Sequence, residues 1–135
     1  MSDIERPAPQ PDADSAPFWA ATLEGVLLVQ NCLDCERGIY YPRSVCPFCM
    51  SENLTWNPAS GRAIINTFTI VHKAPPAFAG EVPYVVALVD LPEGVRMLTR
   101  IVGCEVGDVH IGMEVEVEFS PLTDVAALPY FHPVT

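Results

Sequence analysis

The stretch CLDCERGIYYPRSVCPFC, residues 32–49, decides the fold of the first third of the chain. It holds two Cys-x-x-Cys pairs, Cys32 with Cys35 and Cys46 with Cys49, separated by ten residues. Each pair forms a turn that points two sulfur atoms at one ion, and two such turns complete the tetrahedral shell that Zn²⁺ prefers. Because four protein ligands leave no open position for a substrate, the pattern predicts a structural zinc site.

Three other uses of these cysteines compete with zinc. Two disulfides need an oxidising compartment, and the N-terminal residues have neither the basic start nor the apolar run of a secretory signal. A redox-active pair explains one Cys-x-x-Cys motif but not two. Four thiolates also bind a single iron ion, so zinc and iron both stay open at this point. The fifth cysteine, Cys104, has no partner in the pattern and is predicted to lie at a strand end.

The length and charge of the chain limit its function. With 135 residues it has room for one ordinary domain or two small ones. Its 17 acidic residues outnumber the 7 Lys and Arg, and the net charge of −10 should repel nucleic acids. No apolar run approaches the roughly 20 residues that span a bilayer. We therefore expect a soluble, cytoplasmic protein with neither nucleic-acid nor membrane partners.

The N-terminal region predicts a tail followed by a helix. Residues 1–14 combine three prolines with four acidic side chains, a composition typical of a disordered tail. A helix is expected from Ser15, with Pro17 in its first turn and Gly25 at its end. Three large apolar side chains on this helix cannot share one narrow face, which predicts a second surface for it to cover: Phe18, Trp19 and Leu23.

Short β-branched segments separated by turn residues predict strands in the rest of the chain. Three strands around the cysteine turns form a zinc ribbon in residues 15–59, where the metal supplies on the order of 10 kcal/mol of folding free energy. The strands of residues 60–135 close most economically as a five-stranded OB-type barrel. The predicted strands are 26–30, 39–41 and 54–57 in the ribbon, and 62–73, 82–91, 95–102, 113–120 and 130–134 in the barrel.

Candidate catalytic side chains are scattered along the sequence. His72 precedes a flexible loop at 74–80, where it is better explained as a hydrogen-bonded histidine at the barrel rim. His110 and His132 have no companions at ligand spacing. The alternating acids of residues 113–119 indicate a solvated strand face that discourages edge pairing. No acid, base and nucleophile set emerges, so no catalytic residue is assigned.

An ordered set of motifs resembles one known family, the rubredoxin-like zinc-ribbon plus OB-fold acyl-CoA-associated proteins, long labelled domain of unknown function thirty-five. The resemblance covers about residues 16–134 and includes the aromatic helix and both cysteine pairs. The other motifs are Tyr41-Pro42-Arg43, Ser60-Gly61-Arg62, Thr69-Ile70-Val71-His72, the strand 82–89, Glu93-Gly94, Ile111-Gly112-Met113 and Phe131-His132-Pro133. The family tends to place glycine after each cysteine turn, whereas this chain has Glu36 and Met50. If the backbone there is left-handed, each costs about 1 kcal/mol.

The resemblance implies a mainly β protein with an N-terminal helix, a rubredoxin-like zinc ribbon and a five-stranded OB-fold barrel. It implies a nonenzymatic accessory subunit of a hetero-oligomeric complex in acyl-CoA metabolism. The partner would be a thiolase-like or enoyl-CoA hydratase-like enzyme, including ketothiolase, aldolase and steroid side-chain systems. Catalytic residues would then belong to the partner, while this chain helps to shape the coenzyme A site.

Contact with coenzyme A requires cations against its phosphates and an apolar groove for its pantetheine arm. Arg37, Arg43 and Lys73 are cations near the ribbon or a flexible segment, and Phe78 is an aromatic residue suited to line a groove. These four residues are the hypothesis for coenzyme A contact. Two rival functions remain, a single-stranded nucleic-acid binder, which needs a basic groove with stacking aromatics, and a rubredoxin-like electron carrier, which needs iron.

Overall fold

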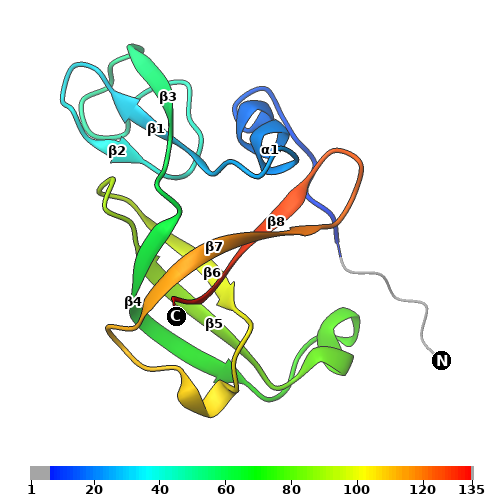
Figure 1. The fold of residues 1–135 in the computed structure, drawn as a ribbon. Coiled ribbons are helices and arrows are strands. Elements are labelled where there is room, and N and C mark those ends of the chain that lie inside the picture. Colours follow the sequence, from blue (N-terminus) through cyan, green and yellow to red (C-terminus); the bar gives the residue numbers. More distant parts are fainter. Residues whose placement is uncertain (1–6, 135) are drawn as a thin grey trace.

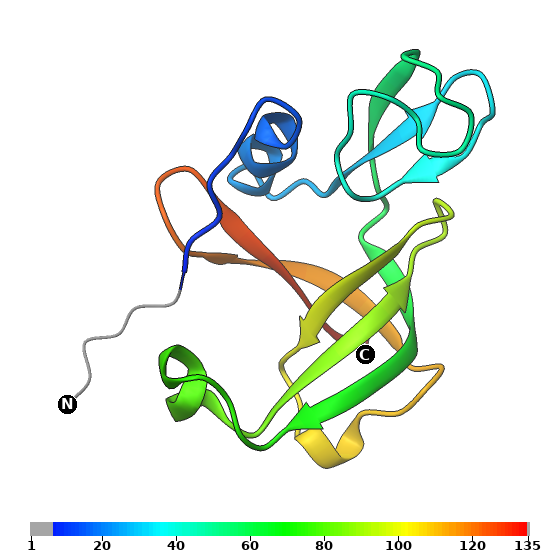
Figure 2. The same ribbon diagram turned by 180° about the vertical axis from the view of Figure 1, so that it is seen from behind.

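The computed structural model describes residues 7–134, and residues 1–6 of the predicted tail lie outside this range. The chain runs from a short helix through a three-stranded ribbon sheet into a closed five-stranded barrel (Figure 1). The helix and the ribbon lie side by side over one end of the barrel in both ribbon views (Figure 2). This architecture confirms the predicted fold class.

Helix α1 (Ala16–Thr22) is shorter than predicted, and Asp12 fixes its start. The backbone N–H of Ser15 donates to Asp12 Oδ1 at 2.8 Å, and the backbone N–H of Asp12 donates to Ser15 Oγ at 3.1 Å. The first of these bonds is the main reason why the pKa of Asp12 is lowered. Gly25, with φ of +76°, adopts the left-handed backbone expected after the helix.

Thr22 fastens this helix to the barrel. It is 1 % exposed, and its hydroxyl donates to the backbone oxygen of Trp19 at 2.6 Å. The same hydroxyl accepts the backbone N–H of Ala127 at 3.0 Å. One buried oxygen therefore connects the last helical turn to the final strand, 105 residues later in the sequence.

Replacing Thr22 by valine is expected to lower the free energy of unfolding by about 1–2 kcal/mol. The side chain keeps its shape, but the buried N–H of Ala127 loses its acceptor. Thr22→Ser, which keeps the hydroxyl, is the matched control. Urea titration of both variants tests the prediction, and equal stabilities would show that the bond to Ala127 contributes nothing.

The ribbon sheet consists of β1 (Leu28–Cys32), β2 (Gly38–Ile39) and β3 (Leu54–Pro58) in the order β2-β1-β3. Both pairings are antiparallel. Strand β1 starts two residues later than predicted and reaches Cys32, the first metal-ligand candidate. Strand β2 ends at Ile39, so Tyr40 and Tyr41, predicted as strand residues, leave the sheet.

The barrel closes in the strand order β4-β5-β6-β8-β7. Strand β4 pairs with both β5 and β7, and its register shifts between Ile65 and Thr67, which lets a long strand turn the corner of the barrel. This order is the OB-type arrangement that the sequence predicts. The strands are β4 (Arg62–Val71), β5 (Tyr84–Asp90), β6 (Arg96–Ile101), β7 (Glu114–Pro121) and β8 (Ala127–Pro133).

The parallel contact between β6 and β8 completes the barrel with few bonds. Only Ile101 and Phe131 form a register pair between these strands. The backbone N–H of Val102 donates to the Phe131 oxygen at 2.8 Å. The hydroxyl of Thr99 adds a bond to the backbone oxygen of Pro129 at 2.9 Å. The remaining neighbours in the barrel pair over longer registers.

One hydrophobic core joins the three parts of the chain. Phe18 of the helix and Val29 of the ribbon belong to the same buried cluster as Phe131 of the barrel, and Val29 and Phe131 are fully buried. A second, much smaller cluster in the ribbon consists of Ile39 with two of the cysteines. The ribbon therefore rests on the barrel core and has little apolar core of its own.

The loop predicted at 74–80 contains a 3₁₀ helix, η1 (Pro76–Glu81). Pro76 at its start suits the first turn of a helix because proline fixes φ near the helical value. A second 3₁₀ turn, η2 (Val106–Asp108), follows the half-buried Cys104, whose thiol pKa is raised mainly by burial. Within residues 7–134, no helix combines the length and the hydropathy needed to cross a membrane.

Candidate metal centre and aromatic groove

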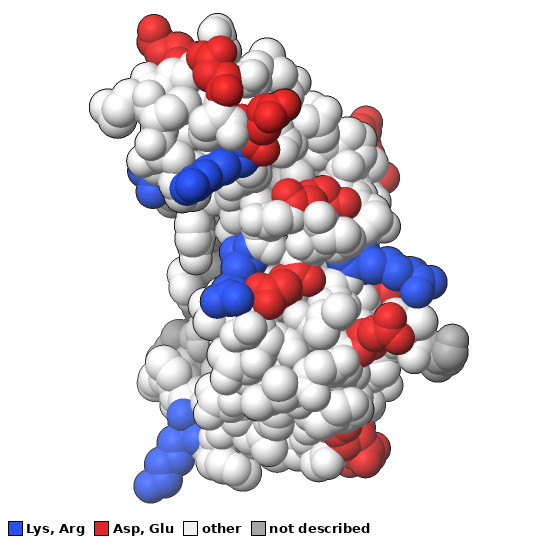
Figure 3. All heavy atoms as spheres, turned by 90° about the vertical axis from the view of Figure 1, so that its left-hand side faces the viewer, with Lys and Arg blue, Asp and Glu red and all other residues white. Residues whose placement is uncertain are grey.

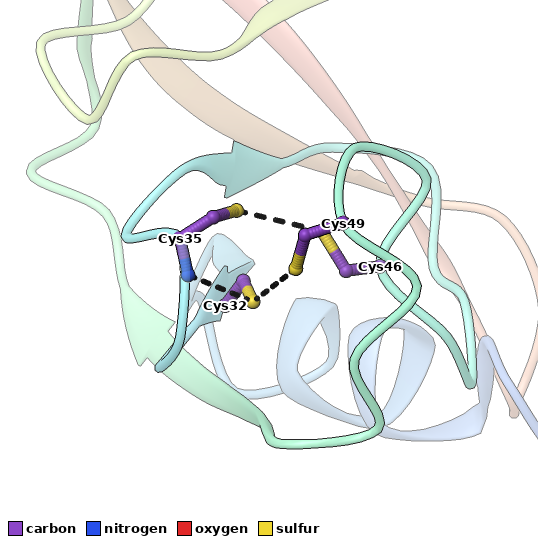
Figure 4. Close-up of side chains that lie close together, drawn as sticks. All are labelled: Cys32, Cys35, Cys46 and Cys49. Atoms are coloured by element: carbon purple, nitrogen blue, oxygen red, sulfur yellow. Dashed lines mark hydrogen bonds between the residues drawn. The ribbon is translucent and has the colours of Figure 1, made fainter.

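The four cysteine sulfurs gather at the end of the ribbon (Figure 4). Cys32 Sγ lies 3.5 Å from Cys49 Sγ, and Cys35 Sγ lies 3.7 Å from Cys46 Sγ. All four atoms lie within 4.8 Å of one another. Zn–S bonds of about 2.3 Å in a tetrahedron place the sulfurs about 3.8 Å apart. The donor set thus fits a tetrahedral metal ion, and it is the one such group within residues 7–134.

The two cysteine turns have the same backbone design. The N–H of Glu36 donates to the Cys32 oxygen at 2.9 Å, and the N–H of Met50 donates to the Cys46 oxygen at 2.9 Å. Glu36 has φ of +64° and Met50 has φ of +67°. Both residues therefore adopt the left-handed backbone conformation that favours glycine. This is the conformation for which the sequence predicted a steric cost at Glu36 and Met50.

Met50→Gly is expected to raise the free energy of unfolding by about 1 kcal/mol because it relieves the steric cost of a left-handed side-chain-bearing residue. The side chain of Met50 is exposed, so its removal costs little packing. Glu52→Gly, at a nearby exposed position without positive φ, is the control. In a denaturant titration, Met50→Gly should have a higher free energy of unfolding than the parent, and Glu52→Gly should have an equal or lower one. The reverse order would show that Met50 is not strained.

Local hydrogen bonds and crowding push the cysteine pKa values apart. The backbone N–H of Cys35, 3.4 Å from Cys32 Sγ, is the main reason why the pKa of Cys32 is lowered to about 6. At Cys49 the backbone N–H of Ser51 lowers the pKa, but burial and the neighbouring thiols outweigh it and raise the pKa to about 12. Closely packed sulfurs resist becoming thiolates together unless a cation lies among them. A bound metal cation would supply that charge.

A groove of about 440 Å³ lies where helix α1, the segment 40–42 and the outer face of β5, β6 and β8 meet. The ring centres of Phe18 and Trp19 are 5.0 Å apart, those of Phe18 and Tyr40 are 5.9 Å apart, and those of Tyr40 and Tyr41 are 5.2 Å apart. Burial raises the pKa of Tyr40, so its hydroxyl stays neutral. We call this the aromatic groove, after its aromatic lining residues Phe18, Trp19, Tyr40, Tyr41, Phe78, Tyr84 and Tyr130.

Arg100 is the cation among the described residues that line the aromatic groove, and it was not predicted from the sequence. Its guanidinium carbon lies 3.9 Å from the ring centre of Tyr84, and its Nη1 lies 2.6 Å from Glu81 Oε1. The side chain is only 15 % exposed. The signal for Arg100 was the alternation along the predicted strand 95–102, which places it on the outer face of the barrel together with Leu98.

A second cavity, of about 380 Å³, separates the ribbon from the turn between β5 and β6. Arg43 and Arg96 line it, and we call it the basic cleft. The buried Gln30 fixes the backbone of Arg43, because its amide donates to the Arg43 oxygen at 2.9 Å and accepts the Arg43 N–H at 2.8 Å. Figure 3 shows that most basic side chains on this face gather where the ribbon meets the barrel.

The four residues predicted to contact coenzyme A separate in the structure. Phe78 lines the aromatic groove, and Arg43 lines the basic cleft. Arg37 lies beside the cleft, with its guanidinium carbon 4.7 Å from the ring centre of Phe48, a cleft residue. Lys73 lines neither cavity. Their role in binding coenzyme A stays a prediction.

The outer face of β7 and the end of β8 carry a small charged cluster. His132, which lacks a companion at ligand spacing in the sequence, lies 2.9 Å from Glu118 and 3.8 Å from Glu116. Arg62 lies 3.5 Å from Glu116. These side chains are between one third and three fifths exposed, so the contacts are surface interactions of small energy.

Comparisons with known proteins agree with this geometry. The family description "ChsH2, rubredoxin-like zinc ribbon domain" matches residues 19–55, and "ChsH2, C-terminal OB-fold domain" matches residues 56–120. A "DUF35 domain-containing scaffold protein" of Methanocaldococcus jannaschii is 38 % identical over 95 residues, which cover 69 % of this chain and 67 % of the relative. The chain belongs to the DUF35 family. The family resemblance stated from the sequence is thereby confirmed.

Two further similar proteins are named for an aldolase and for an enoyl-CoA hydratase. A solved chain titled "Ltp2-ChsH2(DUF35) aldolase" superposes with a TM-score of 0.83 at 33 % identity, covering 95 % of this chain and all of that chain. A "Probable enoyl-CoA hydratase alpha subunit" of Thermomonospora curvata is 35 % identical over 95 % of this chain. This DUF35 chain spans only 40 % of that subunit's length.

Proposed function

We propose that this DUF35 chain is a nonenzymatic accessory subunit of an acyl-CoA-processing enzyme. Its partner is a thiolase-like lyase, acyltransferase or aldolase, or an enoyl-CoA hydratase, acting on acyl groups of the fatty-acid or steroid side-chain type. The observation that carries the proposal is the match, over the full length of the solved chain, to a protein titled as part of a DUF35 aldolase. The similarity to a hydratase alpha subunit supports the same class of partner.

The composition of the surface is consistent with a protein partner. Tyr, Trp and Arg are the residues that contribute most to protein–protein binding, and they make up six of the fifteen residues that line the aromatic groove. Large apolar side chains near the groove are also exposed, including Tyr41 at 63 % and Leu98 at 55 %. The nucleic-acid-binding alternative gains no support, because the basic cleft is short and the chain has a net charge of −10.

Zinc is the metal that we assign to the four cysteines, in a structural role. A bound Zn²⁺ supplies cross-linking and charge compensation, and four thiolates leave it no position for a substrate. The residues that hold it, Cys32, Cys35, Cys46 and Cys49, flank the segment that carries Tyr40, Tyr41 and Arg43. The cysteine cluster thereby sets the position of the ribbon walls of both cavities. A reducing cytoplasm, our proposed location, keeps these thiols available.

Coenzyme A contact is the finer part of the proposal. Arg43 and Arg37 offer guanidinium groups for phosphate, and Phe78 offers an aromatic wall for the pantetheine arm. Lys73 is retained as a proposed contact because it is an exposed cation just beyond the end of β4, although it lines neither cavity. The reaction itself then belongs to the partner subunit.

Co-purification of the tagged protein from its own host tests the function. The expected result is a stoichiometric thiolase-like or hydratase-like enzyme whose turnover of acyl-CoA falls when this chain is removed and returns when it is added back. Recovery of RNA or DNA without such an enzyme would contradict the proposal. Visible absorbance from bound iron would favour the electron carrier instead, and turnover of a thioester by the chain alone would exclude a purely accessory role.

A further inference from the structure

The aromatic groove and the basic cleft meet at two neighbouring side chains. Both Tyr40 and Tyr41 line the aromatic groove, and both also line the basic cleft. Their ring centres are 5.2 Å apart, and the ring of Tyr41 is largely exposed between the two spaces. The two cavities, of about 440 and 380 Å³, are each within the usual size of a small-molecule site. An extended ligand that passes Tyr41 would occupy both.

The aromatic groove favours an uncharged part of a ligand. The cation among its described lining residues, Arg100, is already paired with Glu81 at 2.6 Å and covered by the Tyr84 ring at 3.9 Å. Tyr40 keeps its proton because burial raises its pKa. A charged group in this groove would lose water without gaining a free partner of opposite sign, so an uncharged chain fits best.

The basic cleft favours an anionic part. Arg43 and Arg37 make no ion pair with any residue between 7 and 134, in a chain whose acids outnumber its cations by ten. Arg96, the other cleft cation, is bound to Asp90 at 2.5 Å and still has its side chain 53 % exposed. Gln30, which is 4 % exposed, holds the backbone of Arg43 in place. Positioned guanidinium groups without carboxylate partners are suited to phosphate.

We infer that the aromatic groove and the basic cleft form one continuous site for an amphiphilic ligand with an uncharged arm and a phosphorylated head. The arm lies along the aromatic groove, the phosphates lie against the unpaired Arg43 with the exposed, Asp90-bound Arg96 on the opposite side of the cleft, and Tyr41 marks the junction. The inference rests on the proposed function, in which such a ligand is an acyl-coenzyme A thioester. It adds the orientation of the ligand and two residues, Tyr41 and Arg96, that the sequence analysis did not assign.

Fluorescence of Trp19, which lines the groove, reports on the arm of the ligand. The chain has two tryptophans, so a Trp56→Phe background leaves Trp19 as the sole reporter. Octanoyl-coenzyme A should change the Trp19 emission in a saturable manner. The phosphoadenosine fragment of coenzyme A should compete for the site without changing the emission, because it fills only the cleft. Octanoate alone should bind far more weakly than octanoyl-coenzyme A.

Two substitutions separate the halves of the site. Arg43→Gln should weaken octanoyl-coenzyme A about tenfold, the usual effect of one charged hydrogen bond, and should also weaken the phosphoadenosine fragment. Leu98→Asp puts a charge on the exposed wall of the groove, and should weaken octanoyl-coenzyme A at least tenfold without affecting the fragment. Arg62→Gln removes the same charge outside both cavities and is the control for net charge.

Several results would overturn the inference. These are the absence of a saturable Trp19 response up to millimolar octanoyl-coenzyme A, equal weakening by Arg43→Gln and Arg62→Gln, or unchanged binding by Leu98→Asp. The outcome is independent of the co-purification test. An acyl-CoA enzyme that accompanies a chain without ligand response leaves the proposed function intact and removes this site. Saturable binding by a chain without such an enzyme retains the site and removes the function.

Discussion

Cys46→Ser is expected to abolish tight zinc binding and to unfold the ribbon at ordinary temperature. Cys46 is fully buried, and its sulfur lies 3.7 Å from that of Cys35. A serine oxygen is a poor ligand for Zn²⁺ in a thiolate site, and structural zinc contributes on the order of 10 kcal/mol to the folding of such a module. The loss of a large part of that free energy would be a larger destabilisation than we expect from any other substitution proposed for this chain.

The ribbon has no large hydrophobic core that could stabilise it in place of the metal. Its own buried cluster contains Ile39 and the two cysteines Cys32 and Cys46, with Leu54 packed partly against them. The barrel, by contrast, has a large core and should remain folded, although it loses the cover of the ribbon. We therefore expect a partly folded protein in which Tyr40 and Tyr41 no longer form a wall of the aromatic groove.

Zinc content and circular dichroism check this result. The parent should contain one zinc per chain, and Cys46→Ser should contain far less and lose near-ultraviolet signal while keeping most of its strand signal. Cys104→Ser is the control, because Cys104 is a half-buried cysteine outside the cluster. Undiminished zinc content in Cys46→Ser, or an equal loss in Cys104→Ser, would refute the assignment of the ligands.

Gly38→Ala is the substitution with the second largest expected effect, a loss of about 2–3 kcal/mol in the free energy of unfolding. A Cβ atom at this position would lie 2.8 Å from the backbone oxygen of Glu93 and 2.8 Å from Val95 Cγ1. The first is a backbone atom and Val95 is buried, so neither can move away cheaply. The ribbon would have to separate from the turn between β5 and β6.

Because Gly38 also lines the basic cleft, the same substitution should weaken any ligand or partner held there. Urea titration measures the stability, and Gly107→Ala is the control, since a Cβ at Gly107 has no atom within 4 Å. If Gly38→Ala were as stable as Gly107→Ala, the contact between ribbon and barrel would be looser than the structure shows.

The strands were largely predictable because their chemistry is local. Alternation and turn residues place every barrel strand within three residues of its observed start. The largest offset is in β8, which begins at Ala127 rather than Tyr130, since its first residues are added by pairing with Pro121 and Ser120 of β7. Because these residues become a strand by pairing with another strand, their own sequence does not show where β8 begins.

The metal site was also predictable, whereas the cavities were not. Four cysteines with fixed spacing carry their geometry in the sequence itself. The groove, however, depends on the meeting of a helix, a ribbon segment and three strands, and Arg100 becomes its cation only because Tyr84 and Glu81 are brought beside it. Gly38 is a further example, because its requirement for a small residue arises from a turn more than fifty residues later.

The sparse bonding between β6 and β8 has a consequence for motion. The barrel should open most readily along this seam, and the amide of Val102 should exchange its hydrogen for deuterium sooner than amides in the long β4–β5 ladder. The aromatic groove spans this seam, with Thr99 on one side and Pro129 on the other. A ligand or partner in the groove would contact both β6 and β8, and would therefore slow the opening of the barrel.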